Sequence, residues 1–216
     1  MSLDFDSFIV RLGARLRRPL PGANAHVPLR ATPTGSIKPD FSHKTPPKPG
    51  AVLILLYPEE GKVMFPLTKR AEYNGAHSGQ ISLPGGKSEG EESAAETALR
   101  EGEEEIGIRR SDIKVIGTLT DFFVIPSNFL VTPVIAYQSQ KPLLTPDPVE
   151  VFRILECDVA DILDDAAIHT REILVAKTFQ MMAPHFLVEK EIVWGATAMM
   201  LNEFRLVVRD VLSSKS

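Results

Sequence analysis

The chain has 216 residues, a net charge of −4 and 44% hydrophobic residues, which suits one globular domain, or one domain with extensions. This acidic balance does not favour nucleic acid or a membrane surface as a partner. The single Cys157 excludes an intramolecular disulfide; with no secretory signal and no bilayer-spanning apolar run, we expect a cytoplasmic location.

Residues 4–18 place apolar side chains on one helical face, which predicts an amphipathic helix that docks on the body of the protein. A basic targeting helix is the alternative, but Asp4 and Asp6 argue against it, because such peptides are poor in acids. Eight prolines follow between Pro19 and Pro49, so we expect an extended arm on the surface. The predicted division is therefore residues 1–49, a helix and arm packed on the body, and residues 50–216, the main domain.

Residues 51–57, AVLILLY, form a continuous apolar run, as expected of a strand buried on both faces. A turn at residues 59–61 leads to a return strand at 63–70, in which Pro66 implies an edge position or a bulge. Further strands are predicted at 113–119 and 130–137, and helices near 159–163 and 196–211. This mixture predicts an α/β fold, with helices on the faces of a curved mixed sheet.

Residues 85–108, GGKSEGEESAAETALREGEEEIGI, carry eight acids between Glu89 and Glu105. The preceding glycines turn the chain into a short helix, and Gly107 occupies the position expected of a left-handed C-terminal residue. Glu101, Glu104 and Glu105 share one helical face, where their carboxylates suit Mg²⁺ or Mn²⁺ together with substrate oxygens. The opposite face is apolar and contains Ala95, Ala98, Leu99, Gly102 and Ile106.

The same stretch resembles the Nudix box, because its seven fixed positions are all present: Gly86, Glu92, Arg100, Glu101, Glu104, Glu105 and Gly107. One departure is Gly102, where the family usually has a non-glycine residue, and we expect close packing there. The resemblance implies a Nudix-type α/β/α sandwich, a metal held by Glu101, Glu104 and Glu105, and an Arg100 that orients the carboxylates. The competing interpretation is a solvated acidic helix, which needs neither this spacing nor the flanking glycines.

Segments outside the box are similar to the coenzyme A pyrophosphatase branch of that family. They comprise Leu67-Thr68-Lys69-Arg70, then His77, then Gly79-Gln80-Ile81-Ser82-Leu83-Pro84-Gly85-Gly86, and later residues 147–151 and 194–198. The branch has an arginine two positions before the histidine, where this chain has Gly75. This departure weakens the assignment to coenzyme A.

Several residues outside the helix are candidates for substrate contacts, and each has an ordinary structural alternative. Lys69 and Arg70 bind phosphates or are solvated bases. His77 fixes the loop or takes part directly, and Glu150 is a ligand or general base or else caps a turn. The loop candidates for substrate binding are Gly79, Gln80, Gly85 and Gly86.

The resemblance implies hydrolysis of coenzyme A or its derivatives to 3′,5′-ADP and 4′-phosphopantetheine species, by Mg²⁺ or Mn²⁺ and water. Glu104, Glu105, Arg100 and Glu150 are the predicted catalytic residues. Another nucleoside diphosphate linked to a second group, such as ADP-ribose, NADH or a dinucleotide, is the alternative substrate. A non-catalytic nucleotide-binding module is the alternative class. The apolar N-terminal helix and the proline-rich arm also suggest a homodimer, although both can instead fold back on their own subunit.

Overall fold

The apolar run at residues 51–57 lies at the centre of the fold, in strand β2 (Lys48–Glu59). A computed structural model describes residues 4–35, 42–71, 79–175 and 178–214. Five side chains in succession, Leu53 to Tyr57, are completely buried in this strand. A strand that is buried on both sides requires a layer on each face of its sheet, and the fold supplies both.

The main sheet has eight strands, with the order β4-β3-β2-β8-β6 and three strands paired beside this path. Strand β2 runs parallel to β8 (Phe129–Tyr137) and forms an antiparallel hairpin with β3 (Lys62–Arg70). The remaining strands are β4 (Ile81–Ser82), β5 (Gly85–Lys87), β6 (Lys114–Thr118), β7 (Phe122–Val124) and β9 (Val151–Asp158). This mixed sheet and its helices agree with the predicted α/β class.

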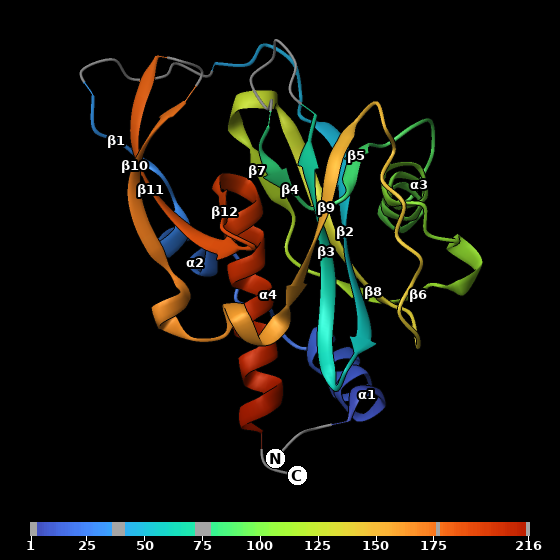
Figure 1. Ribbon diagram of the computed structural model, residues 1–216. Helices are drawn as coiled ribbons and strands as arrows, with labels where there is room; N and C mark the ends of the chain where they lie inside the picture. Colours follow the sequence, from blue (N-terminus) through green and yellow to red (C-terminus); the bar gives the residue numbers. More distant parts are fainter. Residues whose placement is uncertain (1–3, 36–41, 72–78, 176–177, 215–216) are drawn as a thin grey trace.

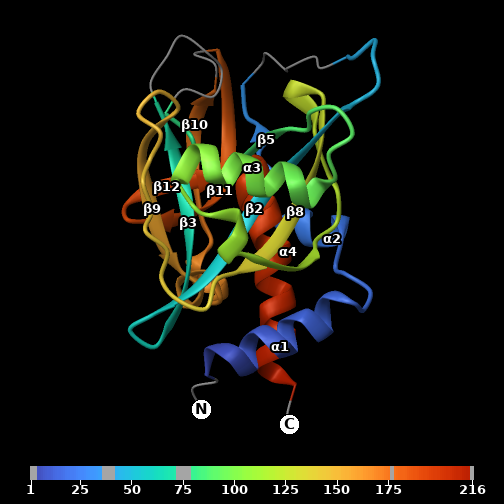
Figure 2. The same ribbon diagram turned by 90° about the vertical axis from the view of Figure 1, so that its right-hand side faces the viewer.

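Helix α3 (Ala94–Ile106) covers one face of the sheet, and α4 (Gly195–Ser213) covers the other (Figure 2). The side chains of β2 alternate between two hydrophobic clusters, because successive residues of a strand point to opposite faces. Leu53 and Leu55 join the cluster beneath α3, whereas Ile54 and Leu56 join the larger cluster that includes α4. The sandwich is thus a consequence of one doubly apolar strand.

A second sheet flanks α4 and was not predicted from the sequence. It contains β10 (His169–Val175) and β11 (Phe179–Val188), with β1 (Thr32–Pro33) and β12 (Glu191–Trp194) both paired to β11 (Figure 1). Short 3-10 helices complete the described chain: η1 (Val27–Leu29), η2 (Arg110–Asp112), η3 (Ile125–Ser127), η4 (Val159–Ile162) and η5 (Asp165–Ala167).

Most of the predicted elements are present, with three corrections. The helix expected near 159–163 is the single 3-10 turn η4. The proline-rich segment is not extended throughout, because it contains α2 (Ala23–His26) and η1 and buries Leu29. Strand β3 is neither an edge strand nor bulged at Pro66, because Pro66 pairs with Glu156 of β9. On the other side of β3, the pairing with β2 ends at Met64 and that with β4 begins at Thr68. A proline has no N–H to donate, so this locally unpaired side suits it.

Helix α1 (Phe5–Leu16) and the segment after it are attached to α4 by polar contacts. Arg11 donates to the carbonyl groups of Val211 and Ser214 at the end of α4, and Arg15 pairs with Asp210 at 2.8 Å.

No helix among the described residues is long and apolar enough to cross a membrane.

A buried carboxylate on α4 holds the segment that follows α1. Glu203 is completely buried and accepts hydrogen bonds from Gly22 N at 2.9 Å, from Thr120 Oγ1 at 2.7 Å and from His26 Nε2 at 3.1 Å. Burial acts to raise the pKa of Glu203, but the hydrogen bonds from His26, Thr120 and Gly22 outweigh it and leave the pKa below its usual value. The ionised carboxylate therefore stabilises this junction.

Replacing Glu203 with Gln should lower the free energy of unfolding by about 2–4 kcal/mol at pH 7, because His26 loses its partner in a buried site. Chemical denaturation measures the effect. The matched control is Glu172→Gln, which alters an exposed carboxylate that accepts from Thr34 Oγ1; we expect a change within about 0.5 kcal/mol.

The pH dependence tests the same contact. Because the pKa of Glu203 is lower in the folded chain, its contribution is fully present above the unfolded value and is lost as the pH falls through the folded value. The stability difference between the parent and Glu203→Gln should therefore shrink below about pH 4.5. A difference that stays constant down to pH 3 would contradict this account.

Candidate active site

Helix α3 begins later than the sequence pattern suggested. Gly85 to Lys87 form β5, which pairs with residues 50–52 of β2, so the glycines extend the sheet and do not lead straight into the helix. The helix begins after Ser93, whose side chain and that of Glu96 form a reciprocal capping box. The spacing of Ser93 and Glu96 was readable in the sequence as a helix start.

The other end of α3 and its packed face agree with the predictions. Gly107 adopts the left-handed conformation and ends the helix. A Cβ atom on Gly102 would lie 2.8 Å from Ile108 Cδ1 and 2.9 Å from Leu53 Cδ2. The glycine that departs from the family pattern therefore lets α3 approach β2 closely, as expected.

Arg100 organises the carboxylates around it. Its Nε donates to Glu92 Oε1 at 2.8 Å, and its Nη2 donates to the carbonyl oxygen of Lys87 at 2.9 Å. The hydrogen bond from Arg100 lowers the pKa of Glu92 to about 2. The Arg100 guanidinium thus links α3 to β5 and to the loop that contains Glu92. Glu92 is therefore a structural partner that orients the remaining N–H groups of Arg100.

Two of the predicted metal ligands already converge on a positive group. Arg100 Nη1 lies 2.8 Å from Glu101 Oε1 and 3.1 Å from Glu104 Oε2. The Glu101 side chain is largely buried, whereas that of Glu104 is 57% exposed. Burial raises the pKa of Glu101, although Arg100 opposes this effect.

Glu105, the third predicted ligand, is only 5% exposed. Its Oε2 accepts a hydrogen bond from Gly85 N at 3.3 Å, which is long for such a contact. Burial raises the pKa of Glu105 to about 7, and Arg70 counteracts part of this rise. A carboxylate that is removed from water with so little compensation fits a site for a divalent cation.

The described residues contain no group of three or more acid, histidine or cysteine side chains already arranged around a metal position. Glu101 and Glu104 face Arg100, while Glu105 faces Gly85. A shared cation would therefore require Glu101 and Glu104 to turn from the guanidinium. The set offers oxygen donors only, which is the chemistry that Mg²⁺ and Mn²⁺ prefer.

Arg70 approaches this acidic face from the end of β3. Its charge acts on Glu105, and its buried Nε has no hydrogen-bond partner among the residues that the structure describes. Its backbone N–H donates to the carbonyl of Gln80 at 3.0 Å, so the strand end and the loop before β4 are fixed together. A buried guanidinium N–H without a partner suits an anionic group of a ligand.

Glu150 reaches the acids from the loop that precedes β9. Its charge raises the pKa of both Glu101 and Glu105, which places it within electrostatic range of each. Its carbonyl accepts from Ala71 N at 3.0 Å, and its own N–H donates to Asp147 Oδ1 at 2.9 Å. Asp147, and not Glu150, is therefore the residue whose side chain caps this turn, and the Glu150 carboxylate stays exposed.

Lys69 forms an ion pair with a residue of the second sheet. Adjacent residues of a strand point to opposite faces, and Lys69 lies on the face of Leu67, which packs in the α4 cluster. Its Nζ pairs with Glu191 Oε1 at 2.8 Å, and Arg153 contacts the same oxygen at 3.4 Å. The pair with Glu191 agrees with the structural alternative for Lys69, and its predicted role in substrate binding stays a prediction. No local pattern predicted the contact, because Glu191 lies in the unpredicted β12.

The remaining loop candidates are placed only in part. Gly79 adopts a positive φ of 68° at a turn, and Gln80 joins β4 to it. His77 and the divergent Gly75 lie outside the described residues, so their predicted roles stay predictions.

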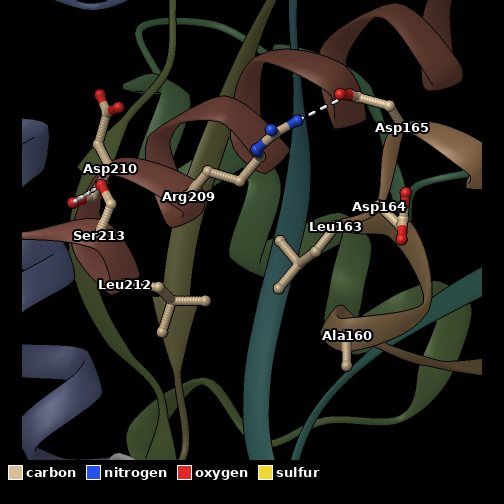
Figure 3. A pocket seen from close by; sticks show the side chains of 8 residues that line it. All are labelled: Ala160, Leu163, Asp164, Asp165, Arg209, Asp210, Leu212 and Ser213. Carbon is tan, nitrogen blue, oxygen red and sulfur yellow. Dashed lines mark hydrogen bonds and ion pairs between the residues drawn. The ribbon is translucent and has the colours of Figure 1, made fainter.

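A cavity of about 770 Å³ lies beside the C-terminal end of α4 (Figure 3). Its lining includes Leu163 and Leu212, and Arg209 pairs there with Asp165 at 2.7 Å. None of the box residues lines it. The chemistry of the carboxylates, and not the size of a cavity, therefore identifies the candidate site.

Comparisons with known proteins agree with this site. Residues 47–180 match the model of the NUDIX domain. The chain is 34% identical over 176 residues to "Nudix hydrolase 22, chloroplastic" of Arabidopsis thaliana, a match that covers 75% of this chain and 56% of that protein. It is 30% identical over 139 residues to the uncharacterized Nudix hydrolase NudL of Photorhabdus laumondii, covering 63% of this chain and 73% of the relative.

The fold is also similar to a crystal structure of RenU, a Nudix hydrolase from M. Smegmatis. The TM-score is 0.50 at 18% identity, and the match covers 76% of this chain and 87% of that one. This likeness concerns the fold alone. The chain spans little more than half of the plant relative's length, so the activity of that whole protein does not transfer automatically.

Gly86 provides a test of the geometry, because a Cβ atom there would lie 2.5 Å from the Glu101 carboxylate. Gly86→Ala should displace that carboxylate and lower kcat/KM for a diphosphate substrate by about 100-fold or more, as expected when a charge-stabilising group is misplaced. Circular dichroism should show the parental fold. The control is Gly13→Ala, whose Cβ would come no closer than 4.0 Å to Ile116; parental kinetics in Gly86→Ala would contradict the placement of Glu101.

Proposed function

The chain belongs to the Nudix family, and we propose that it is a Mg²⁺- or Mn²⁺-dependent pyrophosphohydrolase that cleaves the diphosphate linkage of coenzyme A or its derivatives. The observation that carries the proposal is the buried Glu105 carboxylate, which accepts from Gly85 N and lies on the same helix as Glu101 and Glu104. Negative groups that share a face at such a cost in desolvation need a cation.

Glu101, Glu104 and Glu105 would hold the metal through carboxylate oxygens. When bound, such an ion neutralises phosphate charge and lowers the pKa of a water molecule. The residues of the chain do the rest by positioning. Arg100 fixes Glu101 and Glu104 relative to β5, and Arg70 supplies a buried N–H group for a phosphate oxygen. Catalysis of this kind depends mainly on electrostatics and orientation.

We assign the proton acceptor to Glu150. Its carboxylate is exposed, lies within electrostatic range of Glu101 and Glu105, and comes from a loop anchored by Asp147. It can therefore take a proton from a water molecule without giving up a metal contact. Glu105 is the alternative acceptor, because burial brings its pKa to about 7 in the metal-free chain.

The coenzyme A assignment is supported by how the similar segments come together. The end of β3 is hydrogen-bonded to the loop at Gln80, Ala71 is bonded to Glu150, and Thr197 of α4 donates to the carbonyl of Ile81 at 3.4 Å. Segments that resemble the coenzyme A branch at residues 67–70, 79–86, 147–151 and 194–198 thus adjoin one another around the end of β3 and β4.

Gly75, in place of the arginine of that branch, leaves a second substrate class in play: another nucleoside diphosphate linked to a second group. A panel of coenzyme A, acyl-coenzyme A, NADH, ADP-ribose and dinucleoside polyphosphates, with products read by mass spectrometry, decides between them. We expect 3′,5′-ADP from coenzyme A. Turnover of ADP-ribose with coenzyme A untouched would overturn the substrate assignment.

A non-catalytic nucleotide-binding module would bind members of the panel and hydrolyse none with either metal. The intact set of box carboxylates argues against it.

We further propose a homodimer in the cytoplasm; a monomeric mass by light scattering at micromolar concentration would reject the dimer.

Glu104→Gln should reduce kcat by about 10³-fold or more, roughly 4 kcal/mol, while the fold persists, because a charge contact made in the transition state is lost. Its metal-free stability should stay within about 0.5 kcal/mol of the parent, because the pair that it loses with Arg100 is exposed. Addition of Mg²⁺ with a substrate analogue should raise the Tm of the parent more than that of the variant. Equal increases in Tm for the two proteins would show that Glu104 does not bind the metal.

Glu150→Gln separates base catalysis from metal binding. We expect kcat to fall by about 10²–10⁴-fold, the range for removal of a general base, while the metal-induced shift in Tm stays parental. A loss of that shift would make Glu150 a metal ligand instead. An unchanged kcat would show that a group other than Glu150 accepts the proton.

A further inference from the structure

The loop between β8 and β9 is docked on the C-terminal end of α3, the helix that carries the box carboxylates. The last carbonyl groups of a helix have no partner within it, and this loop supplies donors for two of them. Thr145 N donates to the carbonyl of Ile106 at 2.9 Å. Asp147 N donates to the carbonyl of Glu105 at 3.0 Å. The loop that supplies Glu150 is therefore bonded to the backbone of a proposed metal ligand.

Two further contacts hold the same loop against α3. Leu144 packs in the hydrophobic cluster beneath the helix. A Cβ atom on Gly107 would lie 3.1 Å from the Cβ of Thr145 and 3.2 Å from its carbonyl oxygen, which leaves little room for a side chain. The glycine that ends the helix thus also lets the loop approach it, so that the loop and the helix pack as one unit.

Asp147 shapes the turn that ends at Glu150. Its Oδ1 accepts from Val149 N at 2.8 Å and from Glu150 N at 2.9 Å, and its carbonyl accepts from Val151 N at 3.0 Å. An aspartate followed by a proline suits such a turn, because Pro148 presets its own backbone and has no N–H that needs a partner. The carboxylate therefore binds the first two N–H groups that the turn offers.

The other side of Glu150 is fixed to β3. Its carbonyl accepts from Ala71 N at 3.0 Å, and its neighbour Val151 pairs with Arg70 across the β3–β9 ladder. Glu150 thus lies between the strand end that carries Arg70 and a turn that is bonded to α3. Because its backbone is held on both sides, the direction of its side chain depends on the turn that Asp147 caps.

We propose that Asp147 is a positioning residue for the reaction, because it holds the Glu150 carboxylate in a fixed place relative to the metal-binding helix. This inference rests on the proposed function, since it takes Glu150 as the proton acceptor and Glu105 as a metal ligand. The partners of the Asp147 carboxylate are backbone N–H groups, not the metal or the substrate. A general base must lie within hydrogen-bond reach of the proton that it removes, so a displacement of about 1 Å in the turn is enough to slow the reaction.

The test is the kinetics of Asp147→Ala and Asp147→Asn on whichever diphosphate substrate the parent hydrolyses. Asp147→Ala should lower kcat by about 10–100-fold, as expected of a misplaced group, with KM within about twofold of the parent. Asp147→Asn should restore kcat, because its side-chain oxygen accepts the same two hydrogen bonds. A parental kcat in Asp147→Ala, or no rescue by Asp147→Asn, would overturn the proposal.

The matched control is Asp164→Ala. It removes a hydrogen bond of the same kind, from Ala166 N to Asp164 Oδ1 at 2.9 Å, at the start of η5. We expect both kinetic constants to stay parental in this variant.

A double-mutant cycle separates positioning from general destabilisation. If Asp147 acts through Glu150, then Asp147→Ala should lower kcat by no more than about twofold in the Glu150→Gln background, whereas independent effects would multiply. Multiplied effects would overturn the positioning role and leave the proposed function intact.

A parent that hydrolyses no member of the panel would instead overturn the proposed function. Amide hydrogen exchange then decides whether Asp147 holds the turn. We expect faster exchange at Val149 and Glu150 in Asp147→Ala and parental exchange in Asp147→Asn. Unchanged exchange in Asp147→Ala would show that Asp147 does not order this turn.

Discussion

The rest of the site depends on burying the carboxylate of Glu105 between α3 and the end of the sheet. A group with an ordinary pKa near 4.5 is held where burial brings that pKa to about 7, which is a cost to the folded state near neutral pH. The opposing contributions, from Arg70 and from the backbone of Gly85, compensate only in part. Glu105 stays buried because rotation of α3 about its axis would expose Ala98 and Ile106, which are fully buried on the same helix.

That orientation is fixed from both ends of α3. The capping box at Ser93 and the left-handed Gly107 set where the helix begins and ends, and Gly102 lets its axis approach Leu53 and Ile108. Arg100 then links the helix to Glu92 and to the carbonyl of Lys87. Because hydrogen bonds and packing act on the same helix, the carboxylates inherit their positions from contacts that involve no ligand. Such preorganisation is what electrostatic catalysis requires.

The sequence was most informative where a pattern is local. The doubly buried strand, its hairpin, α3, α4 and the N-terminal helix all follow from periodicity, turn residues and caps within a few positions. It was least informative for β9 to β12. The strand β10, for example, is mostly exposed, so its residues lack the alternation that marks a half-buried strand. In the second sheet, β11 pairs with its chain neighbours β10 and β12 and with the distant β1. One-dimensional patterns do not report the pairing with β1.

The same distinction explains which site residues were predicted. The three glutamates and Arg100 stand on one helix, where spacing determines the face, whereas the position of Lys69 depends on Glu191 in β12. Neighbours in sequence were separated: Lys69 and Arg70 point to opposite faces of the sheet. The charge of Arg70 acts on Glu105, whereas Lys69 pairs with Glu191 of the second sheet. Two adjacent bases at one strand end thus meet different partners, because the strands packed on each face decide what each side chain contacts. The sequence of β3 alone contains neither of those partners.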